Sequence, residues 1–387
     1  MPDGREAISI RVVDGLAGVP AGAWDACAGT ANPFVSHAFL ATLEASGTVT
    51  PKTGWMPQHL LIEDTAGALR ACAPLYLKNH SYGEYVFDWA WADASERAGI
   101  PYYPKLQAAV PFTPVTGPRL MVRPGEPGDL GDALIAGMLQ LAERHGASSL
   151  HVTFPTEAEW QRLAAAGLLT RIGHQFHWTN EGYGDFDDFL NALASRKRKA
   201  IRKERQAVAD SGVVLRTLTG DAITERHWDV FYRFYRDTID RKWGPAYLNR
   251  AFFSLLHRNL GERIVLMWAE HGGRAVGGAL NLIGGDTLYG RYWGCLEPYR
   301  FLHFEACYYQ AIAFAIERGL KRVEAGAQGP HKVQRGYLPV VTYSAHWIAD
   351  PALRRAVAQF IEQERQMVEM EGEALAEASP FRKNGGD

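Results

Sequence analysis

Hydrophobic residues in two parts of the chain alternate in the manner typical of β-strands. Residues 59–78 read as a strand, a turn containing glycine and a second strand, which predicts a hairpin. Residues 263–294 show the same arrangement with three strands joined by glycine turns. The two patterns recur about half a chain apart, so two copies of one α/β unit would explain them. Two unrelated hairpins would explain them as well.

Apolar residues at helical spacing predict a helix before the first strand pattern and another after the second. Ser36 is a suitable N-cap for a short helix that stops at Gly47. In the second half, Pro298 begins a turn into a helix of four or more turns that ends at Gly319. Residues 321–327 then read as a short strand. A helix followed by such a strand is typical of a parallel crossover unit.

Residues 185–212 are predicted to form one long amphipathic helix with a strongly basic surface. Its apolar positions are Phe186, Leu190, Leu193, Ile201 and Val208. Its cations are clustered, and Glu204 is the single acid within the run that they form: Arg196, Lys197, Arg198, Lys199, Arg202, Lys203 and Arg205. A solvated helix face and a binding site for a polyanion both explain this cluster. Because cations at this density repel one another, we favour the polyanion site, with Arg198, Lys199 and Arg202 as its contacts.

Composition narrows the class of protein. A length of 387 residues exceeds one ordinary core and predicts about two domains. The formal net charge of -2 excludes a globally basic nucleic-acid-binding protein. The four cysteines form no CxxC pair and indicate buried thiols in a reducing compartment. No signal peptide or membrane-spanning run is visible, so we expect a cytoplasmic protein, with peripheral contact to an anionic inner membrane left open.

The segment EAGAQGPHKVQRGYLP, residues 324–339, holds many chemically active side chains after the predicted strand. In open α/β sheets, ligands gather at the carboxyl ends of such strands. The candidate acid–base residues are Glu324, His331 and Tyr337, with His303 and Glu305 in reserve. The candidate binding residues are Gln328, Lys332 and Arg335. Both reserve residues also have a structural interpretation. The helix dipole favours an acid at the position of Glu305, and His303 can be a packed histidine with no catalytic role. No metal-site spacing, Walker A, GxSxG or NAD fingerprint is present, so we expect no metal and no tightly bound cofactor.

Residues 82–120 are rich in aromatic side chains and proline. An aromatic core wrapped by loops explains this composition. A wall around a long apolar chain or a flat ring system explains it equally. In the second interpretation, Trp55 and Tyr102 are the expected substrate contacts.

Several of these segments, among them FVSHAFLATLEASG, SRKRKAIRKER, GRYWG and GPHKVQRGY, resemble the FemAB-like N-acyltransferases of proteobacteria. The resemblance extends from about Asn32 to Phe381. It implies the α/β (α+β) class, with two tandem GNAT-like domains that each have a mixed central sheet flanked by helices. The implied organisation is a first domain at 1–180, a basic connecting helix at 181–212 and a second domain at 213–387.

One feature departs from the pattern of ordinary acetyltransferases, which bind the CoA pyrophosphate at a glycine-rich loop that opens a helix. Here the equivalent segment carries Glu297 and Glu305, and acids at this place would repel pyrophosphate. The donor then binds differently, against the basic helix, or is an aminoacyl-tRNA as in the Fem-type enzymes.

The resemblance implies acyl transfer to an amine. We expect an acyl thioester, from acyl-CoA or acyl carrier protein, as co-substrate. The expected acceptor is a long-chain sphingoid base, which would give a ceramide-type amide as in the bacterial ceramide synthases of this family. Two alternatives stay open: an aminoacyl-tRNA-dependent transferase acting on a cell-wall or small-molecule amine, and a non-catalytic ligand-binding module. In the enzymatic interpretations Glu324 or His331 is the base, Tyr337 or Gln328 polarises the substrate, and Lys332 and Arg335 anchor a charged group.

Overall fold

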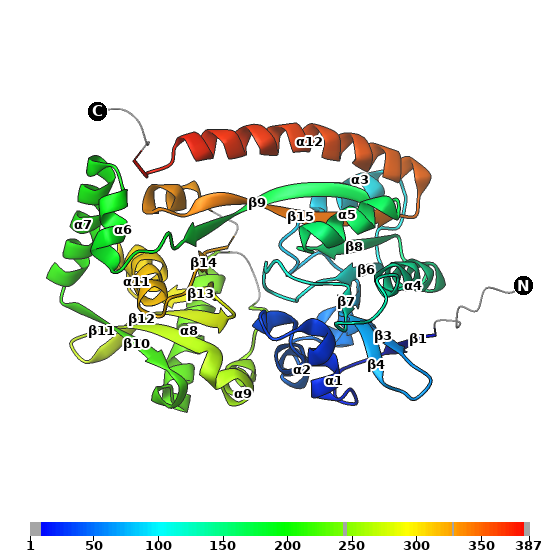
Figure 1. Ribbon diagram of the computed structural model, residues 1–387, viewed down its shortest axis with the longest axis horizontal. Coiled ribbons are helices and arrows are strands. Elements are labelled where there is room, and N and C mark those ends of the chain that lie inside the picture. Colours follow the sequence, from blue (N-terminus) through cyan, green and yellow to red (C-terminus); the bar gives the residue numbers. More distant parts are fainter. Residues whose placement is uncertain (1–8, 243–245, 327–328, 383–387) are drawn as a thin grey trace, which may run out of the picture. The chain divides into compact units, whose positions relative to one another are not determined.

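The computed structural model describes residues 9–242, 246–326 and 329–382. The chain divides into two compact units. Unit 1 comprises Met1–Gly173 with Thr342–Met367, and unit 2 comprises His174–Val341 with Val368–Asp387. Each unit contains a mixed β-sheet flanked by helices, so the predicted α/β class is confirmed (Figure 1).

Unit 1 combines a mixed sheet of order β2–β5–β6–β8–β15 with an antiparallel sheet of order β1–β3–β4–β7. The predicted hairpin is confirmed as the antiparallel pair β3–β4. Helix α4 packs on these strands through a shared apolar core (Figure 1). The elements are β1 Ile10–Val13, α1 Ala21–Ala28, η1 Pro33–Val35, α2 His37–Ala45, η2 Pro51–Thr53, β2 Trp55–Pro57, β3 His59–Glu63, β4 Leu69–Ala73, β5 Tyr76–Lys78, α3 Trp89–Arg97, β6 Lys105–Ala108, β7 Met121–Val122, α4 Leu130–Arg144, β8 Ser149–Thr153 and α5 Glu157–Ala165. Three elements cross from one unit to the other: β9 Leu169–Thr179, β15 Leu338–Ile348 and α12 Pro351–Glu377.

Unit 2 has a sheet of order β10–β11–β12–β13–β14–β9, and the three predicted strands are confirmed as β11, β12 and β13. One face packs against α6, η5 and α11, and the other against α8, whose Phe231 and Phe234 lie against Gly278 and Gly294. The elements are α6 Phe186–Ala192, α7 Ser195–Asp210, β10 Val213–Thr219, η3 Gly220–Ala222, α8 Glu225–Lys242, α9 Arg250–Leu260, η4 Gly261–Arg263, β11 Ile264–His271, β12 Arg274–Gly284, β13 Thr287–Cys295, α10 Leu302–Phe304, η5 Glu305–Tyr309, α11 Gln310–Glu317, β14 Arg322–Glu324 and η6 Pro330–Arg335.

The two units repeat one order of elements, as expected for an internal duplication. In each, a strand and two helices precede antiparallel strands, and a helix then leads to a strand in parallel pairing. The parallel pair is β6–β8 in unit 1 and β13–β14 in unit 2.

The strands that complete the two sheets are exchanged. β8 pairs antiparallel with Ser344–Ile348 of β15, and β14 pairs antiparallel with His177–Thr179 of β9. Each completing strand therefore follows the other unit's parallel strand in the sequence. Because of this exchange, the compact units differ from the contiguous domains 1–180 and 213–387 that the sequence suggested.

The predicted helix after Pro298 is present but irregular. It begins as α10, passes through the π-helical segment η5 and continues as α11. The strand that follows, β14, runs parallel to β13, which confirms the predicted crossover. π-Helical turns are uncommon and frequently occur at functional sites.

The prediction of one helix over residues 185–212 is wrong, because the chain is extended between α6 and α7. Leu193 has φ -84° and ψ 152°, and it pairs with Phe381 in an isolated antiparallel bridge. The backbone N–H of Ala194 donates to Pro380 O at 2.9 Å. These contacts with the chain near its C-terminus replace the helical hydrogen bonds at this point, while Leu193 stays fully buried.

Candidate functional site

Strands β13 and β14 separate in the sheet of unit 2. Their parallel pairing covers Thr287–Tyr289 and Arg322–Glu324, and β13 then continues to Cys295. A β-bulge in the β12–β13 pairing leaves Arg291 as an extra residue. Bulges often redirect a side chain beside an active site, and ligands of open α/β sheets bind at the carboxyl ends of parallel strands. The point of separation is therefore the centre of the candidate site.

Three side chains from adjacent strands form a row at this point: Arg291 of β13, Glu324 of β14 and His177 of β9. Arg291 Nη2 donates to Glu324 Oε2 at 3.3 Å, and His177 Nε2 lies 3.9 Å from Glu324 Oε1. Their side chains are only 2%, 4% and 6% exposed, respectively. We call these residues the Arg291–Glu324–His177 row.

Burial sets the protonation of this row. It raises the pKa of Glu324, and the charge of Arg291 opposes that rise. Burial, followed by the charges of Arg322 and Arg291, lowers the pKa of His177 to about 3, so the ring is neutral near pH 7. Nε2 of His177 faces Glu324 Oε1 and, at 3.4 Å, Gln175 Oε1. Because both neighbours are acceptors, Nε2 carries the ring proton and Nδ1 is left as an acceptor.

The segment after β14 is held by two cations that the sequence suggested as substrate anchors. Lys332 Nζ donates to Ala325 O at 2.6 Å and to Gly326 O at 3.1 Å. Burial lowers the pKa of Lys332 to about 8. Arg335 Nη1 donates to His331 O at 2.8 Å. Both side chains therefore fix the backbone that follows Glu324.

Arg335 also pairs with Glu204 of the basic helix α7. Its Nη2 donates to Glu204 Oε1 at 2.8 Å and to Oε2 at 3.0 Å. The hydroxyl of Tyr309, in η5, donates to the same carboxylate. The guanidinium of Arg335 lies over the Phe304 ring, 3.5 Å from its centroid. We call Arg335, Glu204 and Tyr309 the Glu204 clamp, since it joins η6, α7 and η5.

The other predicted acid–base residues occupy different positions in unit 2. His331 is exposed, and its Nε2 is 3.1 Å from the hydroxyl of Tyr308. Burial lowers the pKa of His331. Tyr337 is fully buried, and its hydroxyl donates to Tyr308 O at 3.2 Å. Among these candidates, only Glu324 belongs to the row.

The reserve pair lies on the helix that leads to β14. Glu305 is buried and forms an ion pair with Arg205 at 3.2 Å, and Gln310 donates to it at 2.7 Å. His303 is half-buried and packs against the rings of Trp293 and Tyr308. The charge of Glu305 is thus compensated by Arg205, which reduces the repulsion of pyrophosphate expected from this acid.

The remaining predicted contacts are not members of the row. Gln328 lies outside the described residues. Trp55 and Tyr102 belong to unit 1, where both are buried. Lys78 Nζ lies 3.3 Å from the centroid of the Trp55 ring, and the Tyr102 hydroxyl donates to Asp88 at 2.7 Å. These contacts match the core interpretation of the aromatic segment.

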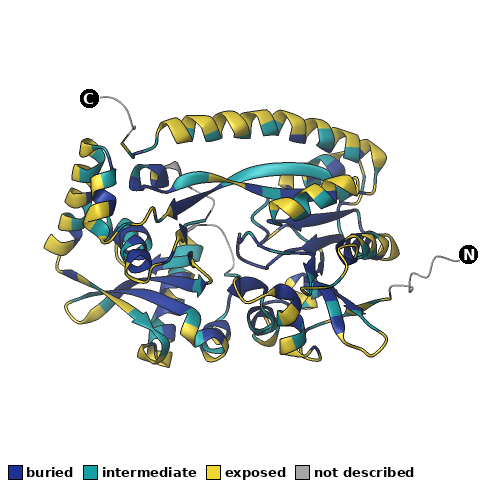
Figure 2. Ribbon diagram, viewed as in Figure 1, coloured by how far each residue is buried: buried dark blue, intermediate teal, exposed yellow. Residues whose placement is uncertain are grey.

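Helix α7 presents part of its basic surface to solvent, and Figure 2 shows most of its ribbon in the colour of exposed residues. Lys199 and Arg202 are exposed, and Arg198 is half-buried. Arg202 forms a surface ion pair with Asp187 at 3.1 Å. The exposed cations leave α7 open to a polyanion, while its inward side serves the Glu204 clamp and Arg205.

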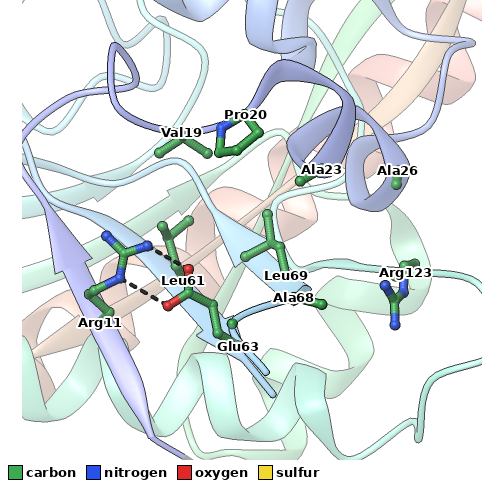
Figure 3. Close-up of a pocket in the computed structure, with 11 residues that line it drawn as sticks. Arg11, Val19, Pro20, Ala23, Ala26, Leu61, Glu63, Ala68, Leu69 and Arg123 are labelled. Carbon is green, nitrogen blue, oxygen red and sulfur yellow. Dashed lines mark hydrogen bonds and ion pairs between the residues drawn. The ribbon is translucent and has the colours of Figure 1, made fainter. Parts of the chain in front are cut away.

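A cavity of about 460 Å³ lies in unit 2 and includes His177 in its wall. It is lined by alternate residues of two strands, His177 and Thr179 of β9 and Leu338 and Val340 of β15. Tyr183 and Phe381 line it as well. We call it the β9 pocket. Another cavity, of about 160 Å³, lies in unit 1 between α1 and the β3–β4 hairpin (Figure 3). Its charged lining residues are already paired, Arg11 with Glu63 and Arg123 with Glu126.

Three residues of the site escaped the sequence analysis. Arg291 stood within the GRYWG segment without an assigned role, and His177 lay in a strand with no motif around it. Glu204 gave a usable signal, since it is the single acid within the run of seven cations from Arg196 to Arg205. An isolated acid in such a place indicates a specific cationic partner, which is Arg335.

None of the helices in the described residues combines the length and the apolar character that a membrane span requires. No group of three or more His, Cys, Asp or Glu side chains in the described residues is arranged to hold a metal ion.

Comparison with known proteins gives one family match. A family model named FemAB_like, described as peptidoglycan biosynthesis/recognition, matches residues 15–383. Among curated proteins, none matches the sequence.

Several solved structures resemble the chain. FemX has a TM-score of 0.54 at 12% identity, over 87% of this chain and 97% of FemX. L-PGS from Bacillus licheniformis has a TM-score of 0.51 at 10% identity, over 86% and 98% of the two chains. A tandem GNAT protein from the clavulanic acid biosynthesis pathway gives 0.46 at 14% identity, over 89% and 99%. At these identities the first two show a shared fold.

Proposed function

We propose, from the premise that this chain belongs to the FemAB-like family, that it transfers an acyl group to a primary amine and forms an amide. The observation that carries the proposal is the Arg291–Glu324–His177 row at the separation of β13 and β14. A buried carboxylate beside a neutral imidazole is suited to accept a proton from an amine.

In the proposed reaction, the nitrogen of the amine attacks the acyl carbon of an activated donor. The new C–N bond forms while the bond from the acyl carbon to the donor's sulfur or oxygen breaks. The amine gives up its proton to the row, and the leaving thiolate or alkoxide takes up a proton. Glu324 is the final base, and His177 passes the proton by accepting at Nδ1 and releasing from Nε2 toward Glu324.

Arg291 has a supporting role in this proposal. Its ion pair with Glu324 opposes the effect of burial, so it keeps a larger fraction of the carboxylate ionised. Lys332 and the Glu204 clamp hold the backbone after β14 in place, which orients the row for the reaction. No covalent enzyme intermediate is needed when donor and amine bind together.

The finer proposal for the donor is an acyl thioester, from acyl-CoA or acyl carrier protein, with a long-chain sphingoid base as acceptor. The neutralisation of Glu305 by Arg205 supports binding of a pyrophosphate near the start of this helix. The burial of Trp55 and Tyr102 removes the observation that suggested a wall for long chains.

A second candidate donor is an aminoacyl-tRNA, favoured by the exposed cations of α7 and by the family. Binding through phosphates predicts an affinity that falls steeply with salt. Activity that is lost after ribonuclease treatment would identify this donor. Activity that survives ribonuclease and requires acyl-CoA or acyl carrier protein would identify the thioester.

The test of the proposed function compares a deletion strain with its parent by lipid and metabolite profiling. We expect one amide to be absent from the deletion strain and to return on complementation with the unchanged gene. A Glu324→Gln gene should fail to restore it, because loss of a general base costs about 10²–10⁴-fold in rate. Immunoblotting and thermal unfolding of the variant verify equal amounts of folded protein. Full restoration by the variant would contradict the role of Glu324, and an unchanged amide profile would contradict the function.

A further inference from the structure

The lining of the β9 pocket changes from a buried histidine at its base, through apolar walls, to a polar rim. At the base, His177 is buried, and its ring is also the group nearest to Glu324 on β9. The walls are apolar and partly exposed, formed by Leu338, Val340 and Phe381. The cavity of about 460 Å³ falls within the range of about 300–1,000 Å³ that is typical of small-molecule sites.

The rim carries polar groups that protein does not occupy. The side chains of Thr179, Glu181 and Asn191 are exposed, and within the described part of the chain they form no hydrogen bond with other protein groups. The exposed Arg382 also lines the pocket, and its Nε donates to Leu193 O at 3.4 Å. Thr179, Glu181 and Asn191 can therefore receive donors of a bound molecule at the mouth of the pocket.

The base of the pocket selects for a hydrogen-bond donor. His177 keeps its proton on Nε2, because that nitrogen faces the oxygens of Gln175 and Glu324. The ring then has an acceptor nitrogen left, which matches an N–H donor and does not match a carboxylate. A ligand nitrogen bound to this ring is one side chain away from Glu324.

We infer that the β9 pocket is the acceptor site and that it takes a primary amine carried on an apolar chain. This inference rests on the proposed amide-forming function, in which Glu324, next to His177, is the base. The amine lies at His177, the apolar chain passes between Leu338, Val340 and Phe381, and polar groups at its far end meet the rim. The pocket thereby sets which amines reach the reacting row.

The chain offers a matched pair of variants for the test. Val340 lines the pocket, whereas its neighbour Val341 does not, and the two are 40% and 41% exposed. Successive strand residues point to opposite faces, so the same substitution fills the pocket at one position and leaves it open at the next. The variants are Val340→Trp and Val341→Trp.

The experiment measures binding of hexylamine, 1-hexanol and hexanoate to the whole protein by titration calorimetry. We expect hexylamine to bind best and hexanoate at least about tenfold more weakly, because a carboxylate cannot donate to His177. Val340→Trp should weaken hexylamine binding by at least about tenfold, and Val341→Trp should change it by less than about twofold. Thermal unfolding and circular dichroism of both variants show whether the fold is retained.

Two results would overturn the inference: equal hexylamine affinity in the two variants, or hexanoate binding as tightly as hexylamine. If Val340→Trp fails to fold, Val340→Phe and Val341→Phe replace the pair. The measurement uses no donor and no turnover, so it is separate from the Glu324→Gln test. Retained turnover in Glu324→Gln would contradict the role of Glu324, and an unchanged amide profile of the deletion strain would contradict the proposed function. In either case the hexylamine result still tests the pocket by itself.

Discussion

The carboxylate of Glu324 is largely shielded from water, since the side chain is only 4% exposed. An isolated buried carboxylate would take up a proton rather than stay charged. Arg291 supplies the compensating charge, with its Nη2 3.3 Å from Glu324 Oε2. Arg291 is the extra residue of a β-bulge, and regular pairing of β12 with β13 would not place it there. The protonation of Glu324 therefore depends on a local irregularity in a neighbouring strand.

Replacing Arg291 tests this dependence. Burial raises the pKa of Glu324 and Arg291 lowers it, so Arg291→Gln should raise that pKa further. A base must be ionised to act, so activity is present above its pKa and falls as pH falls through it. The acid limb of the kcat/KM profile should therefore move to higher pH in Arg291→Gln.

Lys321→Gln is the matched control for this profile. Lys321 is near β14 in the chain, but its side chain is 77% exposed and pairs with Asp286. The acid limb of the kcat/KM profile of Lys321→Gln should lie at the same pH as that of the unchanged protein. An identical limb in Arg291→Gln would refute the role of Glu324 as the base.

At the residue level, the sequence allowed the position of Glu324 to be predicted and little more of the row. Glu324 follows a short strand after a helix, a local pattern that places it at a sheet's carboxyl end. Arg291 and His177 reach it only through the pairing of β13 and β9 with β14. Pairing between strands so distant in sequence leaves no local pattern, so these two residues could not be found.

Among the elements, η6 depends on the Glu204 clamp for its position. Arg335 and Glu204 have side chains that are only 9% and 17% exposed, and Tyr309 adds a third partner from the π-helical segment. Removing one member of a buried ion pair leaves an uncompensated charge, which costs far more than losing a surface pair. The clamp thus links the order of the segment after Glu324 to α7.

Glu204→Gln should lower the free energy of unfolding by roughly 3 kcal/mol, because Arg335 would keep a buried charge without its carboxylate. Denaturant unfolding measures this change. Asp187→Asn is the control on the same helix pair, since it removes the exposed Arg202–Asp187 contact and should cost less than about 1 kcal/mol. Equal losses in the two variants would show that the clamp is no stronger than a surface pair.

Elements with strong local patterns were predictable, and those set by distant contacts were not. The hairpin β3–β4 and the strands β11–β13 follow from alternation and glycine turns. The break between α6 and α7 depends on Leu193 and Ala194 meeting the chain near Pro380 and Phe381. Leu193 is apolar at helical spacing, so its sequence position favours the continuous helix that the structure does not have.

For the whole molecule, the exchange of β9 and β15 means that neither unit is a contiguous piece of chain. The repeated strand patterns allowed the duplication to be predicted. They could not show which unit a strand completes, because a strand has the same hydrophobic pattern in either case. The contiguous boundaries at 180 and 213 therefore could not reveal the exchange. One partner of β8 is β6, from the same half of the chain, but the second partner, Ser344–Ile348, is known only from the pairing in the structure.

This organisation predicts the behaviour of fragments. Residues 1–180 alone lack Thr342–Met367, so β8 has an unpaired edge and part of its apolar core is missing. We expect this fragment to aggregate or to lack a cooperative unfolding transition in circular dichroism and gel filtration. A fusion of residues 1–173 to 342–367 through a flexible linker should restore a cooperative transition. A stable monomeric 1–180 fragment would contradict the exchange.

The exchanged strand also has a consequence during synthesis on the ribosome. His151 of β8 and His346 of β15 face each other across the pairing but are 195 residues apart in the chain. At about 5–20 residues per second, the nascent β8 waits roughly 10–40 s for its neighbour to emerge. During that interval it presents a bare strand edge to other polypeptides. The yield of native protein in a cell should therefore depend on chaperone supply and on growth temperature.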